Sequence, residues 1–172
     1  MRYELNNDGE IVRYEGKVDL PSNPEKILVD LFSQESYKCI VLEKNGLVFK
    51  PQITDSSKIN SFQLWVYYGN VRNERRNKKE KKIQLNTKDP RGKKNAIILG
   101  VYGFNSDNKL NNLLISAWNV DNDMNYPSNP SIRGINIDLF QEAKKEGIAF
   151  NKYRNNTAAS FFSITECNAG QE

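Results

Sequence analysis

Short apolar segments bounded by turn residues recur along the chain, and this pattern constrains the fold more than any other feature. In the clearest case, YKCIVLEKNGLVFKPQI, two strand-like runs flank Asn45-Gly46. Asn-Gly between such runs is the strongest short-range signal of a β-hairpin, because the tight turn requires a positive φ at its central residues. Further strand-like runs are RYEL, SFQLWVYYG, KKIQLN, NAIILGVYGF, NLLISAWNV, IAFNKYR and AASFFSI. The sequence therefore predicts a mainly β protein.

Two segments have helical spacing instead. The first begins after Ser22 or Asn23, either of which suits a helix N-cap, and runs to about residue 34. The second precedes Gly147, a residue type that commonly ends helices. The apolar residues that share one face of these helices are Ile27, Leu28, Leu31 and Phe32 in the first, and Leu139, Phe140 and Ala143 in the second. About seven or eight strands with only two helices do not alternate as in a parallel α/β sheet, so we expect an antiparallel, barrel-like sheet closed by two helices.

The composition restricts the classes of protein and of chemistry. A chain of 172 residues with 38% apolar residues suits one domain, which we place at residues 1–165 with a flexible tail at 166–172. No apolar run approaches the ~20 residues of a membrane span and no secretory signal opens the chain, so we expect a cytoplasmic protein with no membrane partner. The chain has no histidine and only two distant cysteines. We therefore expect no zinc or other metal site, no cofactor and no catalytic residue of its own.

Basic charge is concentrated in one part of the chain. Between Arg72 and Lys94 there are eleven basic and three acidic residues, a net charge of +8, whereas the rest of the chain sums to −4. A local basic patch is the electrostatic footprint of a polyanion partner. The patch follows one strand-like run and precedes another, which favours a pre-ordered loop over a free tail.

The order of residues at the start of this patch suggests how it reads a ligand. Arg72, Glu74 and Arg76 would point the same way in an extended segment, with Asn73 and Arg75 on the other side. Arginine can bind guanine through two donors, glutamate can accept from cytosine and asparagine can pair with adenine. The alternative is that Glu74 merely pairs with Arg76 or a nearby lysine on a solvated loop.

The segment YYGNVRNERRNKK resembles the strand and basic arm of the DNA-recognition domain of EcoRII-type restriction endonucleases. The opening YELNNDGEIVRYEGKVDLPSNPEKILVDLF resembles the start of that domain, and the order and spacing agree over residues 1–82. This domain is a pseudobarrel that shares its fold with the B-three domain of plant transcription factors.

The resemblance implies an open seven-stranded antiparallel pseudobarrel with two helices, whose two arms grip the major groove of double-stranded DNA. The arms correspond to residues 6–17 and about 69–82. The expected base contacts are Arg72, Asn73, Glu74, Arg75, Arg76, Asn7, Asp8, Arg13 and Tyr14. The expected phosphate contacts are Lys17, Asn70, Lys78, Lys79, Lys81, Lys82, Arg91 and Lys93.

Three functions follow, in order of preference. The first is sequence-specific binding of duplex DNA as the recognition domain of a restriction or defence system, with a nuclease domain or motor subunit as partner. The second is a small metal-dependent nuclease, for which Glu15, Glu80 and Glu142 each begin a Glu-x-Lys fragment, although none has the apolar strand and Pro-Asp that such a site needs. The third is an RNA-binding barrel, which usually exposes aromatic side chains for stacking.

Overall fold

The computed structural model describes residues 1–33, 36–58, 60–85, 93–104, 112–120, 131–152 and 158–163. The strands in these ranges are β1 (Arg2–Leu5), β2 (Ile11–Tyr14), β3 (Tyr37–Asn45), β4 (Val48–Asp55), β5 (Asn60–Gln63), β6 (Trp65–Asn73), β7 (Glu80–Gln84), β8 (Ala96–Tyr102), β9 (Leu114–Asn119), β10 (Ser131–Asn136), β11 (Ile148–Lys152) and β12 (Ala158–Ser163). The helices are α1 (Pro24–Phe32) and α3 (Ile137–Glu146). The prediction of a mainly β protein with two helices is confirmed.

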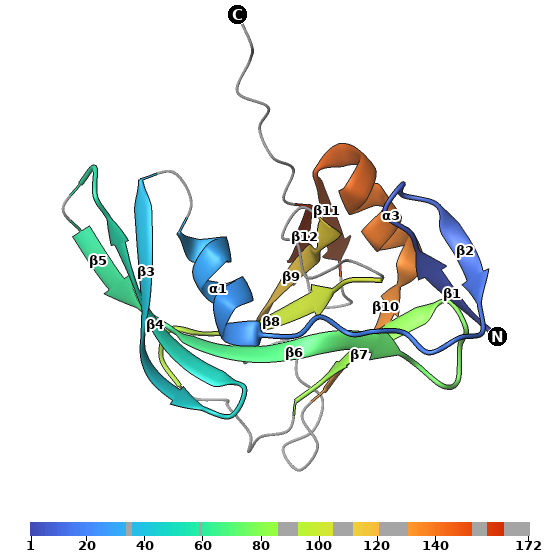
Figure 1. Ribbon diagram of the computed structural model, residues 1–172, viewed down its shortest axis with the longest axis horizontal. Coiled ribbons are helices and arrows are strands. Elements are labelled where there is room, and N and C mark those ends of the chain that lie inside the picture. Colours follow the sequence, from blue (N-terminus) through green and yellow to red (C-terminus); the bar gives the residue numbers. More distant parts are fainter. Residues whose placement is uncertain are drawn as a thin grey trace, which may run out of the picture.

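Ten of the strands form one mixed sheet. Its main path runs β10-β7-β6-β8-β9-β12-β11, and β4 joins it at β6 and carries β3 and β5 (Figure 1). The strands β1 and β2 form a separate antiparallel pair. The predicted hairpin at Asn45-Gly46 is confirmed, since β3 and β4 pair on either side of it and Gly46 has a φ of 59°.

The sheet differs from the prediction because it is neither wholly antiparallel nor closed into a barrel. β6 and β8 pair in parallel, from Trp65 with Ala96 to Asn70 with Val101. This direction arises because β7 turns back from the far end of β6, so β8 starts again beside the beginning of β6. The strands β2 and β10 were not predicted, because each is short and lacks a long apolar run. The single strand predicted for SFQLWVYYG is divided into β5 and β6.

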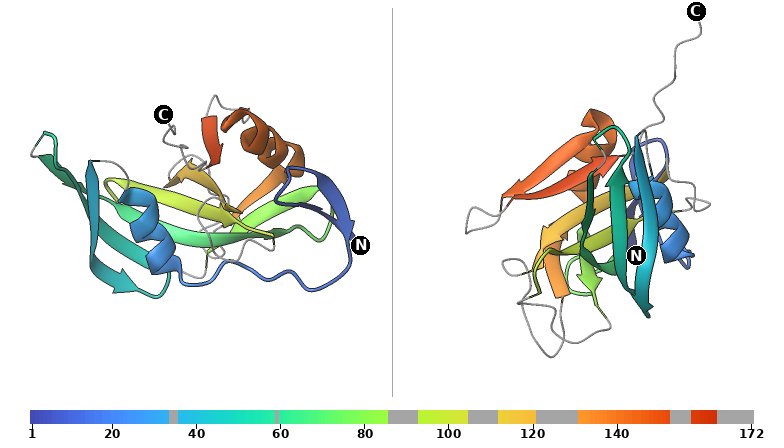
Figure 2. Two further views of the ribbon diagram at one scale, coloured as in Figure 1. Left: turned by 45° about the horizontal axis from the view of Figure 1, so that its top comes forward. Right: turned by 90° about the vertical axis from the view of Figure 1, so that its left-hand side faces the viewer.

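The two helices pack near opposite ends of the long strand β6 (Figures 1 and 2). At the start of α1 the side chain of Asn23 accepts a hydrogen bond from the Lys26 amide, which confirms one of the two predicted caps. At the end of α3, Gly147 adopts the left-handed conformation with a φ of 81°, as predicted for a helix stop. The segment between β2 and α1 passes beside β6, where Asn70 Nδ2 donates to the Pro21 carbonyl at 3.1 Å (Figure 2).

Alternation along β6 divides the apolar side chains into two clusters. Tyr67 and Val71 lie in the cluster around α3, whereas Val66 and Tyr68 lie in the cluster around α1. Trp118 is buried in the first cluster. Because β6 is buried on both faces over this length, it can hold the residues at its end in a fixed position.

Replacement of Gly100 by alanine is expected to lower the free energy of unfolding by about 1–3 kcal/mol, because the site is already filled. Gly69 and Gly100 are partners across the parallel ladder, and the side chain of Ile83 occupies the space above them. A Cβ at Gly100 would lie 2.3 Å from Ile83 Cδ1 and 2.4 Å from Ser116 Oγ. Chemical denaturation measures the change, with the exposed Ser61→Ala as a control expected within about 0.5 kcal/mol of wild type. Equal stability of the two variants would contradict this packing.

Candidate nucleic-acid interface

Both segments predicted as DNA-binding arms are β-hairpins that contact each other. In the second, the end of β6 pairs with β7 through Arg72 with Lys82 and Asn73 with Lys81, and residues 74–79 form the turn. In the first, β2 lies inside the predicted arm 6–17 and pairs with β1. The turn is tied to the rest of the protein, because the amides of Tyr3 and Ile137 donate to the carbonyls of Lys78 and Lys79 at 3.2 and 3.0 Å. The segment expected to be a pre-ordered loop is therefore a strand end and a turn that pack on β1 and α3.

A buried ion pair joins the two hairpins. Lys81 Nζ lies 2.8 Å from Glu4 Oε2, and each side chain is 1% exposed. Lys81 also donates to Asn73 Oδ1 at 2.6 Å, while Asn73 Nδ2 donates to Glu4 Oε1 at 2.6 Å. Tyr102 OH donates to Glu4 Oε2 at 2.9 Å. Every polar atom of this network has a protein partner, as buried charges require.

The pKa values in this network reflect its burial. Desolvation lowers the pKa of Lys81 and outweighs the opposing effect of the Glu4 charge. Desolvation, followed by the Glu4 charge, raises the pKa of Tyr102, so its hydroxyl stays protonated and able to donate.

The network removes Lys81 from the predicted phosphate contacts. Its ammonium is enclosed by Glu4, Asn73 and the Tyr3 carbonyl, so a phosphate cannot reach it without breaking the ion pair. The amide of Asn73, a predicted base contact, already uses both its nitrogen and its oxygen in the same network. These two residues position the hairpin in this structure.

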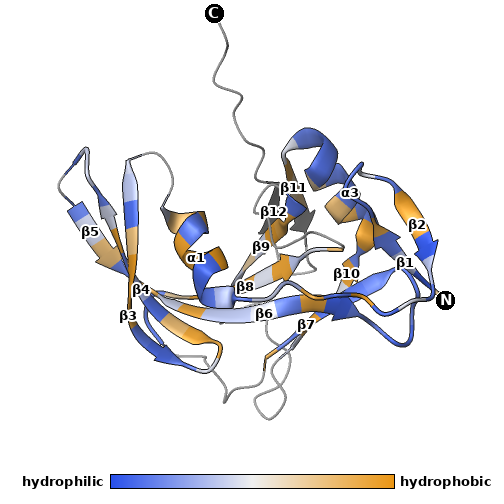
Figure 3. Ribbon diagram, viewed as in Figure 1, coloured by the Kyte–Doolittle hydropathy of each residue, from blue (hydrophilic) through white to orange (hydrophobic). Residues whose placement is uncertain are grey.

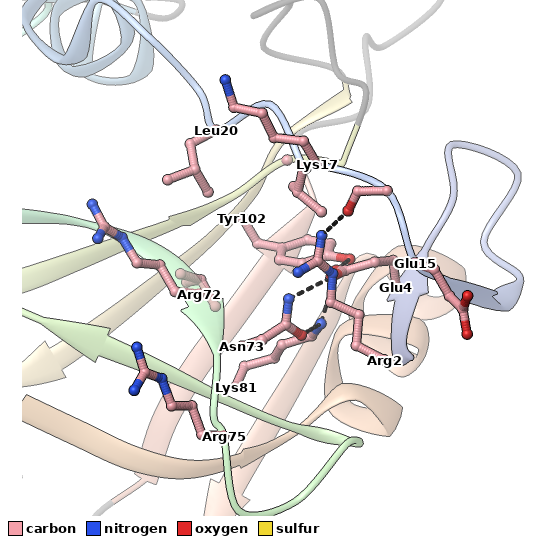
Figure 4. Close-up of a pocket in the computed structure, with 14 residues that line it drawn as sticks. Arg2, Glu4, Glu15, Lys17, Leu20, Arg72, Asn73, Arg75, Lys81 and Tyr102 are labelled. Atoms are coloured by element: carbon pink, nitrogen blue, oxygen red, sulfur yellow. Dashed lines mark hydrogen bonds and ion pairs between the residues drawn. The ribbon is translucent and has the colours of Figure 1, made fainter.

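A cavity of about 600 Å³ is lined in part by this network, and Figure 4 draws the residues that line it. One wall comes from β1 and residues 15–20, and the other comes from the end of β6 and the turn that follows it. The lining includes five basic residues and two acidic ones, a net charge of +3; the basic residues are Arg2, Lys17, Arg72, Arg75 and Lys81, and the acidic ones are Glu4 and Glu15. Burial of Glu4 against Lys81 leaves the remaining positive charge at the rim.

The arginines on the β6 side are exposed, and they lack a carboxylate partner among the residues that the structure describes. Within the described residues, no acidic side chain forms an ion pair with Arg72, Arg75 or Arg76. The guanidinium groups of Arg72 and Arg75 extend in the same direction in Figure 4. The turn that carries Arg75 and Arg76 is uniformly hydrophilic in Figure 3. These arginines are therefore available to an external anion.

Glu74 does not continue the predicted row of base-reading side chains. Its carboxylate lies 3.8 Å from Lys82 Nζ, with the two side chains 11% and 20% exposed, and it accepts a hydrogen bond from the Arg75 amide at 2.7 Å. The extended backbone ends at Asn73, so the alternation that would align Arg76 with Arg72 is lost. The alternative in which Glu74 pairs with a nearby lysine describes this structure better.

The predicted residues of the first arm fall in three places. Asn7 and Asp8 lie in the exposed turn between β1 and β2, and Asp8 lines a separate cavity of about 510 Å³ against α3. Arg13 is exposed beside Tyr3, with its guanidinium 5.9 Å from the ring centre. Tyr14 packs edge-on against Phe104, so its ring is partly in the core. Of these predicted residues and Lys17, only Lys17 lines the cavity beside Arg72.

The remaining predicted phosphate contacts are also dispersed. Lys78 is exposed in the turn, and Lys79 lies 4.0 Å from Asp138. Lys93 lies 3.6 Å from the ring centre of Trp65, at the opposite end of β6 from Arg72. Asn70, in β6, donates a hydrogen bond to the Pro21 carbonyl. Arg91 and the predicted tail 166–172 lie outside the described residues.

Arg2 is the cavity residue that the sequence analysis missed. It was assigned only to a short strand, although its alternation with Glu4 places both on one face of β1. Its guanidinium donates to the Gly16 carbonyl, and Arg2 Nε lies 3.4 Å from Glu4 Oε1. The only available signal was this Arg-x-Glu spacing, which is common by chance.

Comparison with known proteins identifies the family. Residues 62–166 match the model of a family described as Methylase-associated X1. The chain belongs to the Methylase-associated X1 family. The match begins in β5 and includes the β6–β7 hairpin, whereas β1, β2 and α1 precede it. No curated protein and no solved structure matches the chain, so the likeness to a pseudobarrel stays a prediction.

A metal-dependent nuclease, the second predicted function, would need grouped metal ligands. Across the described ranges, no three His, Cys, Asp or Glu side chains are grouped so that they could hold a metal ion. No helix in the same ranges is both long and apolar enough to cross a membrane. The acidic residues of the three Glu-x-Lys fragments lie apart, with Glu15 at the cavity, Glu80 bonded to Asn77 and Glu142 on α3.

Proposed function

We propose that this protein binds double-stranded DNA with the face formed by β1, residues 15–20 and the β6–β7 hairpin. In this proposal it recognises target sites for a restriction–modification system, and a separate domain or subunit carries out the chemistry on DNA. The observation that supports it most is the cavity with a net charge of +3, beside which Arg72 and Arg75 have no carboxylate partner in the described part of the chain. Membership of a methylase-associated family agrees with DNA as the shared ligand.

The geometry suits the major groove, which is wide enough for a two-stranded β-ribbon. Arg72 and Arg75 would supply base contacts, because a guanidinium binds the edge of guanine through two donors. Lys78 and Lys17, both exposed, would contact phosphates and set the register on the duplex. The likeness of residues 1–82 to pseudobarrel domains that grip DNA supports the same arrangement.

Salt-dependent binding to a fluorescent duplex tests the proposal. We expect the association constant to fall steeply as the salt concentration rises. In a plot of the logarithm of the association constant against the logarithm of the salt concentration, each neutralised phosphate makes the slope about 0.9 more negative. Replacement of Lys78 by alanine should reduce that slope by about one unit on preferred and random duplexes alike. Lys38→Ala, an exposed change on β3, should leave the slope unchanged. Absence of duplex binding at low salt would refute the proposal.

A further inference from the structure

We propose that the cavity between β1 and β6 is a seat for one phosphate group, held by Arg2 together with Lys17, with Arg72 on the facing wall of the cavity. If the phosphate belongs to DNA, this inference rests on the proposed function and names the part of the ligand that enters the cavity. The residues come from both sides of the family match, because Arg2 and Lys17 precede it and Arg72 lies within it. The seat would therefore exist only in a chain that carries both parts.

Arg2 has the geometry of a pre-organised anion ligand. Its guanidinium is fixed by the Gly16 carbonyl and by Glu4, and it lies 5.7 Å from the centre of the Tyr14 ring. Nevertheless the side chain stays 32% exposed. A guanidinium has five N–H donors, and these contacts leave donors free for a ligand. A guanidinium that is already held in one orientation loses little conformational entropy when it binds the oxygens of a phosphate.

The charge of Arg2 is not cancelled by its neighbour Glu4. Both carboxylate oxygens of Glu4 are already engaged, since Asn73 donates to Oε1 while Lys81 and Tyr102 donate to Oε2. Lys81 balances the Glu4 charge at a distance of 2.8 Å. Arg2, Lys17, Arg72 and Arg75 then face Glu15 as the only other acidic residue in the described lining. Such an excess of positive charge in a partly enclosed space favours an anion.

The size of the cavity favours a phosphate that is part of a larger molecule. Its volume of about 600 Å³ lies within the ~300–1,000 Å³ typical of ligand sites. A phosphodiester with its adjoining sugars could therefore lie across the cavity, with the phosphate at Arg2. In Figure 4, the Arg2 guanidinium lies between Lys17 and Asn73, and the arginines of β6 and its turn lie on the opposite side.

The first experiment uses inorganic phosphate alone, followed by amide chemical shifts. Wild type should bind it with shifts centred on Arg2, Gly16 and Arg72. Arg2→Met should weaken binding about tenfold or more, because it removes a charge-assisted contact. Arg72→Met, which changes an exposed residue, should also weaken it and does not depend on the folding of β1. The matched control is Lys38→Met, which should bind as wild type.

The second experiment uses a duplex in which one phosphate at a time is replaced by a neutral methylphosphonate. In wild type, replacement at one particular linkage should lower the affinity by about tenfold or more. In Arg2→Met, replacement at that linkage should have no further effect. Phosphate binding without duplex binding would support the seat and refute the proposed function. Duplex binding in which no linkage stands out, and in which Arg2→Met binds like wild type, would refute the seat and leave the proposed function standing.

Discussion

Replacement of Lys81 by methionine will lower the free energy of unfolding by about 3–5 kcal/mol, the cost of leaving a buried partner charge uncompensated. Glu4 would remain buried and, of the described basic residues that pair with it, would keep Arg2, 3.4 Å away. Asn73 Oδ1 and the Tyr3 carbonyl would each lose a donor as well. Urea or guanidinium denaturation of the two proteins measures the difference.

Two variants control this prediction. Lys78→Met makes the same chemical change three residues away at an exposed site, and we expect a change within about 0.5 kcal/mol. Adding Glu4→Gln to Lys81→Met should recover part of the loss, because a neutral amide replaces the unpaired carboxylate while Tyr102 and Asn73 keep partners. If Lys81→Met cost no more than Lys78→Met, the network would not hold the two hairpins together.

Replacement of both Arg72 and Arg75 by glutamine will weaken binding to the preferred duplex by about 2–6 kcal/mol, which is roughly 30-fold or more. Each guanidinium that binds a base through two donors contributes about 1–3 kcal/mol of discrimination. Stability should change little, since both side chains are exposed. Fluorescence anisotropy, with a duplex selected from a randomised pool, measures the loss.

The matched control removes the same charge elsewhere. Lys93→Gln with Lys94→Gln lowers the net charge by two at exposed positions near the start of β8, away from the cavity. We expect this control to weaken preferred and random duplexes by similar, smaller factors. If both double variants had equal effects on both duplexes, general electrostatic attraction would explain binding, and base reading by Arg72 and Arg75 would be wrong.

Local patterns predicted most of the elements but not how the sheet is joined. The Asn45-Gly46 hairpin and both helices follow from turn and cap residues close to each element. The parallel pairing of β6 with β8 depends on where β7 leads the chain, and no local residue pattern encodes that path. The break between β5 and β6 was also missed, because the run SFQLWVYYG has the pattern of one continuous strand.

The candidate site was predictable in the same partial way. The charge run located Arg72 and Arg75, because net charge is visible in the sequence. The same run contains Lys81, which looks like its neighbours until its partner Glu4, 77 residues earlier, is placed beside it. The strand register determines which lysine is buried. Lys81 pairs with Asn73 and its side chain points inward, whereas the side chain of Lys82 lies beside Glu74. Arg2 was missed for the same reason, since its role depends on a contact between distant segments.

Mapping of amide chemical shifts on addition of the preferred duplex tests the central claim most directly. We expect the largest changes on Arg2, residues 15–20 and residues 72–79, with little change on α1 and β3. Changes concentrated at the α1 and β3 end of the sheet, or no changes at any residue, would contradict it.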